Sequence, residues 1–154
     1  MSASEVIKLE EFLPYRLSIL SNTVSNAIAD GYRGRFDLSI PDWRVMAVLA
    51  RFPGSSAQDL VEWTQMDKVA VSRGVSRLLQ RGLLLKNTAD ADRRRSELRL
   101  SAEGEAIYGK IIPLARAYES QLLAAISSEH RDLLAEILAD LQQAAEGLSE
   151  PLER

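Results

Sequence analysis

An arginine-rich segment from Asp90 to Leu100 constrains the fold more than any other part of the sequence. It reads D-A-D-R-R-R-S-E-L-R-L and contains four arginines, Arg93, Arg94, Arg95 and Arg99. From Glu97 onward polar and apolar residues alternate, which is the pattern of a half-buried β-strand. A turn is expected before this run. The segment therefore predicts the tip and the return strand of a short β-hairpin.

Basic charge is concentrated around this hairpin in a chain that is acidic overall. Residues 68–99 carry nine basic and three acidic side chains, a formal charge of +6, whereas the formal net charge of the whole chain is −3. Such a concentration is the electrostatic signature of a surface that binds a polyanion. Charge alone also fits an ordinary solvated surface, so the order of the elements has to decide between the two interpretations.

Size and composition exclude several classes of protein. A chain of 154 residues suits one compact domain, or a small domain with helical extensions. The lack of cysteine excludes disulfides, thiolate metal sites and a thiol-oxidation switch. His130 is the only histidine, which leaves little basis for a metal cluster or a Ser-His-Asp triad. The polar N-terminus is unlike a signal peptide, and no apolar run approaches the roughly 20 residues of a membrane span. We expect a soluble cytoplasmic protein without cofactor or metal.

Apolar periodicity and turn residues predict six helices and one hairpin. The helices are expected over residues 12–33, 40–52, 57–63, 68–81, 102–126 and from 128 onward, and the strands over residues 83–86 and 97–100. Gly31 and Gly34 should end the first helix and Gly82 the fourth, while Pro113 should bend or interrupt the fifth. The expected N-caps of later helices are Ser56, Asp67, Ser101 and Ser127.

This order of elements predicts a mainly α fold with a small β-hairpin, a winged helix-turn-helix. We expect the winged helix-turn-helix in residues 40–100 and a helical region in residues 1–39 and 101–154, all in one continuous domain. The outer helices carry apolar stripes that so small a central domain cannot cover. Two copies of the chain burying these stripes against each other is the simplest solution.

The predicted helix over residues 68–81 has two different faces at about 100° per residue. The face expected to be buried carries Val71, Val75 and Leu78. The opposite face is small and basic, with Val69, Ala70, Arg73, Ser76, Arg77 and Gln80. Small side chains let a helix approach base edges, and arginine can donate two hydrogen bonds to guanine, so this face suits a recognition helix. Phosphate contacts are expected from Lys68, Ser72 and Arg77. A charged solvent face fits the same pattern.

The hairpin favours the DNA-binding interpretation. A basic hairpin just after a helix is how a winged helix holds DNA, and its tip arginines suit the negative potential of a narrow minor groove. Asp92 stands two residues before Arg94, where its carboxylate is able to hold a neighbouring arginine in place. A turn salt bridge of little energetic value fits the same spacing.

Four motifs in this order resemble one known family. They are I-P-D-W-R-V-M at 40–46, S-R-G-V-S-R-L at 72–78, G-L-L at 82–84, and D-R-R at 92–94 followed by L-R-L-S-A-E-G at 98–104. Together they resemble the MarR (multiple antibiotic resistance regulator) family of bacterial transcription factors over residues 12–145. Ser101 stands where that family usually has threonine, and Lys86 and Asn87 stand where it often has arginine or glutamate.

The resemblance implies a homodimeric repressor, located at the nucleoid when bound. The outer helices would form the dimer base, and each winged helix would read half of a palindromic operator. Asp92 and Arg94 match the family's wing pair, with Arg94 in the minor groove. The expected DNA contacts are Lys68, Val69, Ala70, Ser72, Arg73, Ser76, Arg77, Asp92, Arg93, Arg94 and Arg95.

The resemblance also implies a small aromatic or anionic effector that releases the DNA. Candidate effector contacts are Tyr15, Arg16, Trp43 and Met46. Core packing is the alternative for Trp43, and dimer contacts are the alternative for Tyr15 and Arg16.

Two other functions fit parts of the sequence less well. A winged helix that binds a protein instead of DNA is compatible with the acidic net charge, but Arg73 and Arg77 argue against it. An enzyme is not expected, because the acidic pairs lie at a helix start and at a hairpin tip. The chain also has no Gly-rich phosphate loop, nucleophile motif or metal-ligand spacing.

Overall fold

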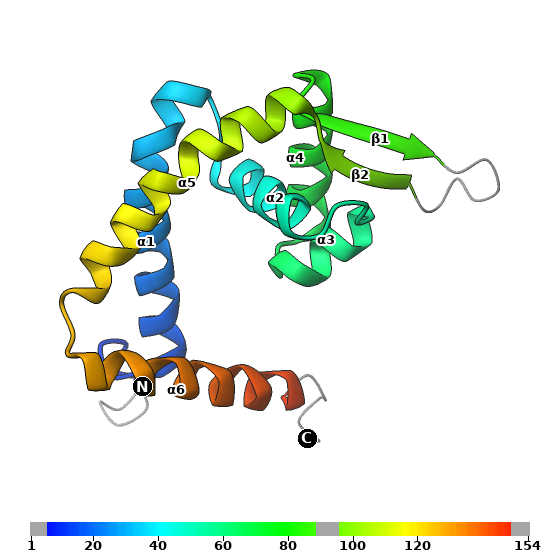
Figure 1. Ribbon diagram of the computed structural model, residues 1–154. Coiled ribbons are helices and arrows are strands. Elements are labelled where there is room, and N and C mark those ends of the chain that lie inside the picture. Colours follow the sequence, from blue (N-terminus) through cyan, green and yellow to red (C-terminus); the bar gives the residue numbers. More distant parts are fainter. Residues whose placement is uncertain (1–5, 89–95, 149–154) are drawn as a thin grey trace. The chain divides into compact units, whose positions relative to one another are not determined.

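The computed structural model describes residues 6–88 and 96–148. In these ranges the chain forms six helices and a two-stranded antiparallel sheet (Figure 1). The helices are α1 (Leu13–Phe36), α2 (Ile40–Arg51), α3 (Ala57–Thr64), α4 (Lys68–Gln80), α5 (Ala102–Leu123) and α6 (Ser128–Gly147), and the strands are β1 (Leu84–Thr88) and β2 (Ser96–Leu100). The predicted fold class and element order are confirmed. The contacts divide the chain into two units, residues 1–115 and 116–154.

Side-chain caps fix where the helices begin. The hydroxyl of Ser56 accepts the amide of Asp59, whose carboxylate accepts the amide of Ser56, so α3 begins with a reciprocal capping box. Asp67 and Ser127 accept the amides three residues later at the starts of α4 and α6. These caps confirm the sequence prediction, and each is worth about 1 kcal/mol. Ser39 forms a second capping box with Asp42 at the start of α2, which the sequence analysis missed.

The predicted end of the first helix is wrong. Gly31 and Gly34 lie inside α1, which continues to Phe36 and ends where Asp37 adopts a left-handed φ of 50°. A glycine inside a helix costs only about 1 kcal/mol relative to alanine, so packing of the last turn outweighs it. Both strands are longer than predicted, and α5 ends at Leu123 and continues through Pro113. Gly82, with φ of 72°, follows α4 as predicted.

The hairpin is attached to the helices along β2. Leu84 pairs with Leu100 and Lys86 with Leu98, and the side chains of Leu84, Leu98 and Leu100 are buried. On its other edge Leu98 exchanges two backbone hydrogen bonds with the loop before α3, to Gly54 at 2.8 Å and Ser55 at 3.0 Å. Strand β2 is thus held by β1, by the loop before α3 and by its buried leucines. These contacts fix the base of the hairpin against α2 and α3.

One hydrophobic core holds the described residues of the first unit together. Its buried members come from α1 to α5 and both strands, and include Tyr32, Val45, Met46, Leu49, Leu60, Val71, Leu78, Leu83, Leu98 and Ile111. The start of α5 lies against the turn after α4. There the hydroxyl of Ser101 donates to the carbonyl of Gly82 at 2.6 Å and accepts the amide of Gly104 at 3.0 Å. Ser101 therefore caps α5 as predicted.

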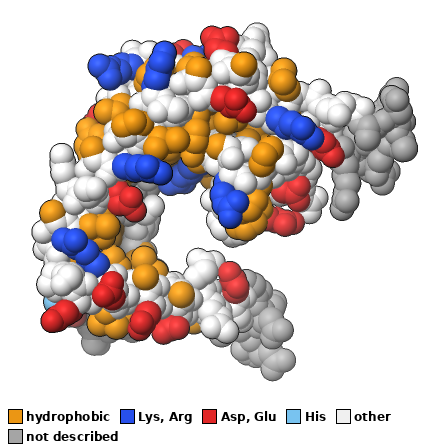
Figure 2. Space-filling view, viewed as in Figure 1, with side chains coloured by type: hydrophobic (Ala, Val, Ile, Leu, Met, Phe, Trp, Pro, Cys, Tyr) orange, Lys and Arg blue, Asp and Glu red, His pale blue; other side chains and the backbone are white. Residues whose placement is uncertain are grey.

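The described residues of the second unit form the last part of α5, a turn and α6. Arg131 donates from Nε to the carbonyl oxygen of Leu123 at 2.9 Å, which joins the two helices. Along α6 no described side chain is buried. Figure 2 shows hydrophobic side chains at the surface of α6, interspersed with acidic ones. Across the described residues, none of the helices has the length and apolar character needed to cross a bilayer.

Candidate nucleic-acid interface

Helix α4 has the two faces that its sequence predicts. Val71, Gly74, Val75 and Leu78 are buried. The other side exposes Lys68, Val69, Ser72, Arg73 and Ser76, and Ala70 is half-buried. Val69 is 57% exposed although it is apolar. The exposed face thus carries mainly small side chains, and the long cationic side chain of Arg73 lies beside them.

The start of α4 lies beside α3. The carboxylate of Asp67 accepts the amide of Ala70 at 2.9 Å, which satisfies one of the free donors of the first turn. Lys68 and Ser72 line a hollow of about 380 Å³ between the two helices, together with Gln58 and Glu62 of α3. Two of the three predicted phosphate contacts, Lys68 and Ser72, therefore lie at the same edge of the exposed face.

Arg77 lies against a buried carboxylate. Its guanidinium forms an ion pair with Asp42, whose side chain is 1% exposed, whereas that of Arg77 is 48% exposed. The same Asp42 oxygen accepts the amide of Ser39 at 2.8 Å. The structure thus joins α4 to the start of α2. The predicted phosphate contact of Arg77 stays a prediction.

Arg81 has a different environment from the other cations of the basic segment. Its guanidinium donates to the backbone carbonyls of Phe36, at 2.7 Å, and Asp37, at the end of α1. In the sequence, Arg81 is recognisable only as part of the basic charge. Its four-residue spacing from Arg77 places both arginines on one side of α4, and this was the only local signal of their shared role.

The wing residues lie partly outside the structure. Asp92, Arg93, Arg94 and Arg95 fall outside the described residues, so their assignments stay predictions. On the described strands, Arg99 forms an exposed ion pair with Glu97 at 3.4 Å, which contributes little stability. Lys86 and Ser96 line a hollow of about 230 Å³ that also includes Gln58. Cationic and polar groups of the hairpin thus adjoin α3.

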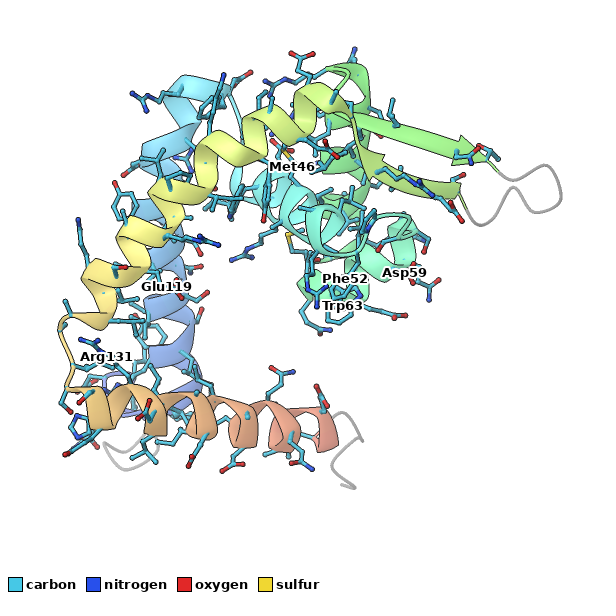
Figure 3. All side chains as sticks on the ribbon, in the orientation of Figure 1. Met46, Phe52, Asp59, Trp63, Glu119 and Arg131 are labelled. Atoms are coloured by element: carbon cyan, nitrogen blue, oxygen red, sulfur yellow. The ribbon has the colours of Figure 1, made fainter. Side chains whose placement is uncertain are left out.

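An aromatic pair joins α2 to α3. The rings of Phe52 and Trp63 stack with centroids 4.3 Å apart (Figure 3), and the guanidinium carbon of Arg51 lies 4.9 Å from the centroid of Phe52. Trp63 is 60% exposed. The pair holds the first helix of the helix-turn-helix against the helix before it.

The structure separates the candidate effector residues into two places. The ring of Trp43 stacks on Tyr108 at 5.1 Å and lies 5.8 Å from Tyr32, while Met46 is completely buried. Tyr15 and Arg16 line an open hollow of about 500 Å³ on the first half of α1. At 1.5 Å per residue, Tyr15 lies about 25 Å along α1 from Tyr32. Within one protomer these residues therefore do not line a common pocket.

Titratable groups add little chemistry here. Burial raises the pKa of Tyr32 above its ordinary value of 10.0, against an opposing effect of Arg33 and Arg44. Among the residues that the structure describes, no three acidic, histidine or cysteine side chains form a group able to hold a metal ion.

The fold and the exposed face of α4 define the chain as a winged helix-turn-helix protein. A family model described as MarR family matches residues 36–95. The transcriptional regulator HosA of Escherichia coli O111:H- is 30% identical over 108 residues, which cover 70% of this chain and 80% of HosA. The chain belongs to the MarR family and is a DNA-binding transcriptional regulator.

Solved structures share the fold over nearly the whole chain. The MarR/EmrR family transcriptional regulator from Acinetobacter sp. ADP1 has a TM-score of 0.83 at 24% identity, covering 92% of this chain and 99% of that one. BpsR of Bordetella bronchiseptica, whose DNA binding is regulated by 6-hydroxynicotinic acid, has a TM-score of 0.77 at 20% identity, covering 89% and 97%. At these identities the likeness concerns the fold alone.

Proposed function

We propose that the chain is a homodimeric repressor that binds a palindromic operator through α4 and the wing. The observation that carries this proposal is the exposed face of α4. It presents Val69, Ser72, Arg73 and Ser76 to solvent, while Val71, Val75 and Leu78 hold the opposite face in the core. A helix with small side chains and a free arginine can enter the major groove and read base edges.

In this proposal the DNA contacts fall into two groups. Lys68, Ser72 and Arg77 bind phosphates, and the remaining contacts on α4 reach the major groove, namely Val69, Ala70, Arg73 and Ser76. Arg94 enters the minor groove, where Asp92 holds the neighbouring arginine. Arg93 and Arg95 bind the backbone. Residues 40–100 would thus form the DNA-binding region.

Residues 1–39 and 101–154 would form the dimer. Support comes from large apolar side chains that the single chain leaves exposed. On α1 these are Leu13, Leu17 and Leu20, with exposed fractions of 40–56%, and on α6 they are Leu133, Leu134, Ile137 and Leu138, with exposed fractions of 37–49%. Contiguous exposed apolar residues are typical of surfaces that bind another protein, and a second copy satisfies both helices at once.

A small aromatic or anionic effector would release the DNA, as 6-hydroxynicotinic acid regulates DNA binding by BpsR. Trp43 offers an aromatic face near Tyr32 and Tyr108, and Met46 is buried in the core. Tyr15 and Arg16 are far from Trp43 along one chain, so a shared effector pocket requires them to come from the second protomer. Titration of the protein with 6-hydroxynicotinic acid, followed by tryptophan fluorescence, tests this site.

A salt titration tests DNA binding. An operator duplex is first selected from a random library with the wild-type protein, and its affinity is measured between about 50 and about 200 mM salt. If Lys68 and Arg77 of both protomers contact phosphates, the slope of log affinity against log salt is about −3.6, and affinity falls by about a hundredfold over this range. Phosphate contacts of the wing would steepen the slope further.

Variants separate this proposal from a winged helix that binds a protein. Arg94→Ala should weaken operator binding without lowering the melting temperature. Arg116→Gln, the same loss of charge on exposed α5 outside the basic segment, should bind like wild type. An affinity that does not respond to salt, with no operator selected, would instead favour the protein-binding function.

A further inference from the structure

Arg81 follows α4 directly, and its guanidinium contacts the end of α1. We propose that Arg81 is a positioning residue: it fixes the recognition helix to the end of α1, contacts no phosphate, and thereby sets the half-site spacing that the dimer accepts. This inference rests on the proposed function, because it assigns a role within operator binding.

The contacts of Arg81 are specific to a guanidinium. Two of its nitrogens donate to adjacent backbone carbonyls, those of Phe36 and Asp37. These carbonyls lie at the end of α1, where the last carbonyls of a helix lack helical partners and the helix dipole favours a cation. A planar guanidinium that binds two adjacent acceptors fixes direction as well as distance, which the single ammonium of lysine does not.

A second arginine reaches the same corner from the same side of α4. Arg77, one turn before Arg81, is paired with Asp42, and Asp42 also accepts the amide of Ser39. Both links therefore end in the short segment 36–42, which joins α1 to α2. Two links one turn apart on one side of a helix restrain its rotation about its own axis as well as its distance from the corner.

The proposed dimer makes this restraint relevant to DNA. If α1 pairs with the second copy, the separation of the two recognition helices depends on how each α4 is held to its own α1. Half-sites read by such dimers lie about 34–36 Å apart, one helical turn of DNA. A base pair inserted between half-sites shifts and rotates one of them. A loosely held α4 would tolerate that change, and a firmly held one would not.

The salt dependence of operator binding distinguishes a positioning role of Arg81 from a phosphate contact. The guanidinium of Arg81 is held by two backbone carbonyls and, in this proposal, meets no phosphate, so its replacement should leave the number of released counterions unchanged. Lys68 is the comparison, because it is an exposed cation of the same helix that is proposed to bind a phosphate, and its side chain forms no hydrogen bond or ion pair with any residue that the structure describes. Loss of one phosphate contact per protomer changes the salt slope by about 1.8 for a dimer.

The experiment compares wild type, K68Q, R81Q and R81K on selected operator duplexes. One duplex has the selected half-site spacing, and two others have one base pair added or removed at the centre. We expect R81Q and R81K to keep the wild-type salt slope and to lose about tenfold of the preference for the selected spacing, the equivalent of one charge-assisted hydrogen bond. We expect K68Q to flatten the slope and to keep the spacing preference.

Three results would overturn the inference. A flattened slope for R81Q would make Arg81 a phosphate contact. A lower melting temperature with an unchanged spacing preference in both Arg81 variants would make its role one of stability alone; R81K keeps the charge and provides this test if R81Q does not fold. Wild-type protein without salt-dependent operator affinity would contradict the proposed function itself, which the first two results leave intact.

Discussion

At the scale of single residues, Gly104 shows how closely α5 approaches the turn before the hairpin. A Cβ at this position would lie 2.1 Å from the backbone carbonyl oxygen of Leu83. Backbone on both sides cannot move without breaking the contacts of Ser101 with Gly82 and Gly104. The position therefore requires glycine for space, although its backbone is helical.

Gly104→Ala should lower the free energy of unfolding by about 2 kcal/mol or more, in the range of an overpacked core. Gly109→Ala, five residues later in α5, is the control because no atom lies within 4 Å of its added Cβ. That variant should gain up to about 1 kcal/mol from helix propensity. Urea denaturation of both variants measures the difference, and equal stabilities would contradict the close approach.

Tyr32 should make the stability of the protein sensitive to alkaline pH. Burial raises its pKa in the folded state above the ordinary value of 10.0. The unfolded chain therefore loses the phenolic proton first, so unfolding becomes more favourable as the pH rises past the unfolded pKa. Stability due to Tyr32 is complete below about pH 10 and is lost as the pH rises through the folded pKa.

Ultraviolet absorbance of tyrosinate, compared between wild type and Tyr32→Phe, tests this prediction. The difference spectrum should titrate above the ordinary tyrosine pKa of 10.0. Urea denaturation of Tyr32→Phe should show less loss of stability between about pH 9 and about pH 11 than wild type. If the difference spectrum titrates at or below the ordinary pKa, the phenol is not desolvated in the folded protein.

At the scale of elements, the sequence predicts what is local and misses what is distant. Ser56, Asp67 and Ser127 were predictable as caps because their acceptor and donor lie three residues apart. The end of α1 was not predictable from local sequence, because the carbonyl of Phe36 there is bound by Arg81, which lies 45 residues later. Likewise the faces of α4 followed from periodicity, whereas the contact of Arg77 with Asp42, 35 residues away, did not.

The Asp42–Arg77 pair links α2 to α4 and should be measurable as an energetic coupling. Removing Asp42 also removes half of the capping box at Ser39. We expect Asp42→Asn to cost about 2 kcal/mol, and Arg77→Gln to cost about the same because it leaves a buried carboxylate unpaired. Because Arg77 is half-exposed, solvent screens the ion pair and limits its contribution to the free energy of unfolding.

A double-mutant cycle separates the ion pair from the cap. If the two side chains interact, the double variant should be more stable than the sum of the single effects predicts, by about 1 kcal/mol. Urea denaturation of the four proteins gives this coupling. Additive effects would mean that Asp42 stabilises the fold through the cap alone.

At the scale of the whole molecule, the proposed dimer and the proposed DNA complex should respond to salt in opposite directions. Between Ser128 and Gly147, α6 carries five acidic side chains and one arginine. Pairing two such helices brings like charges together, and salt screens that repulsion. Binding of DNA by the basic segment releases counterions, so salt weakens it. An assay of operator binding therefore has to be accompanied by a measurement of the dimer at each salt concentration.

Leu134→Glu tests whether the apolar stripe of α6 holds the dimer. Leu134 is 37% exposed in the single chain, so the change should cost the protomer little, whereas a buried glutamate at a dimer interface is strongly unfavourable. Gln143→Glu adds the same charge on the opposite side of α6 and is the control. We expect Leu134→Glu to sediment as a monomer at micromolar concentration and Gln143→Glu as a dimer.

Because a monomer presents only one recognition helix, Leu134→Glu should also lose the preference for two correctly spaced half-sites. A dimer that persists in Leu134→Glu would place the interface elsewhere and leave the apolar face of α6 for another partner.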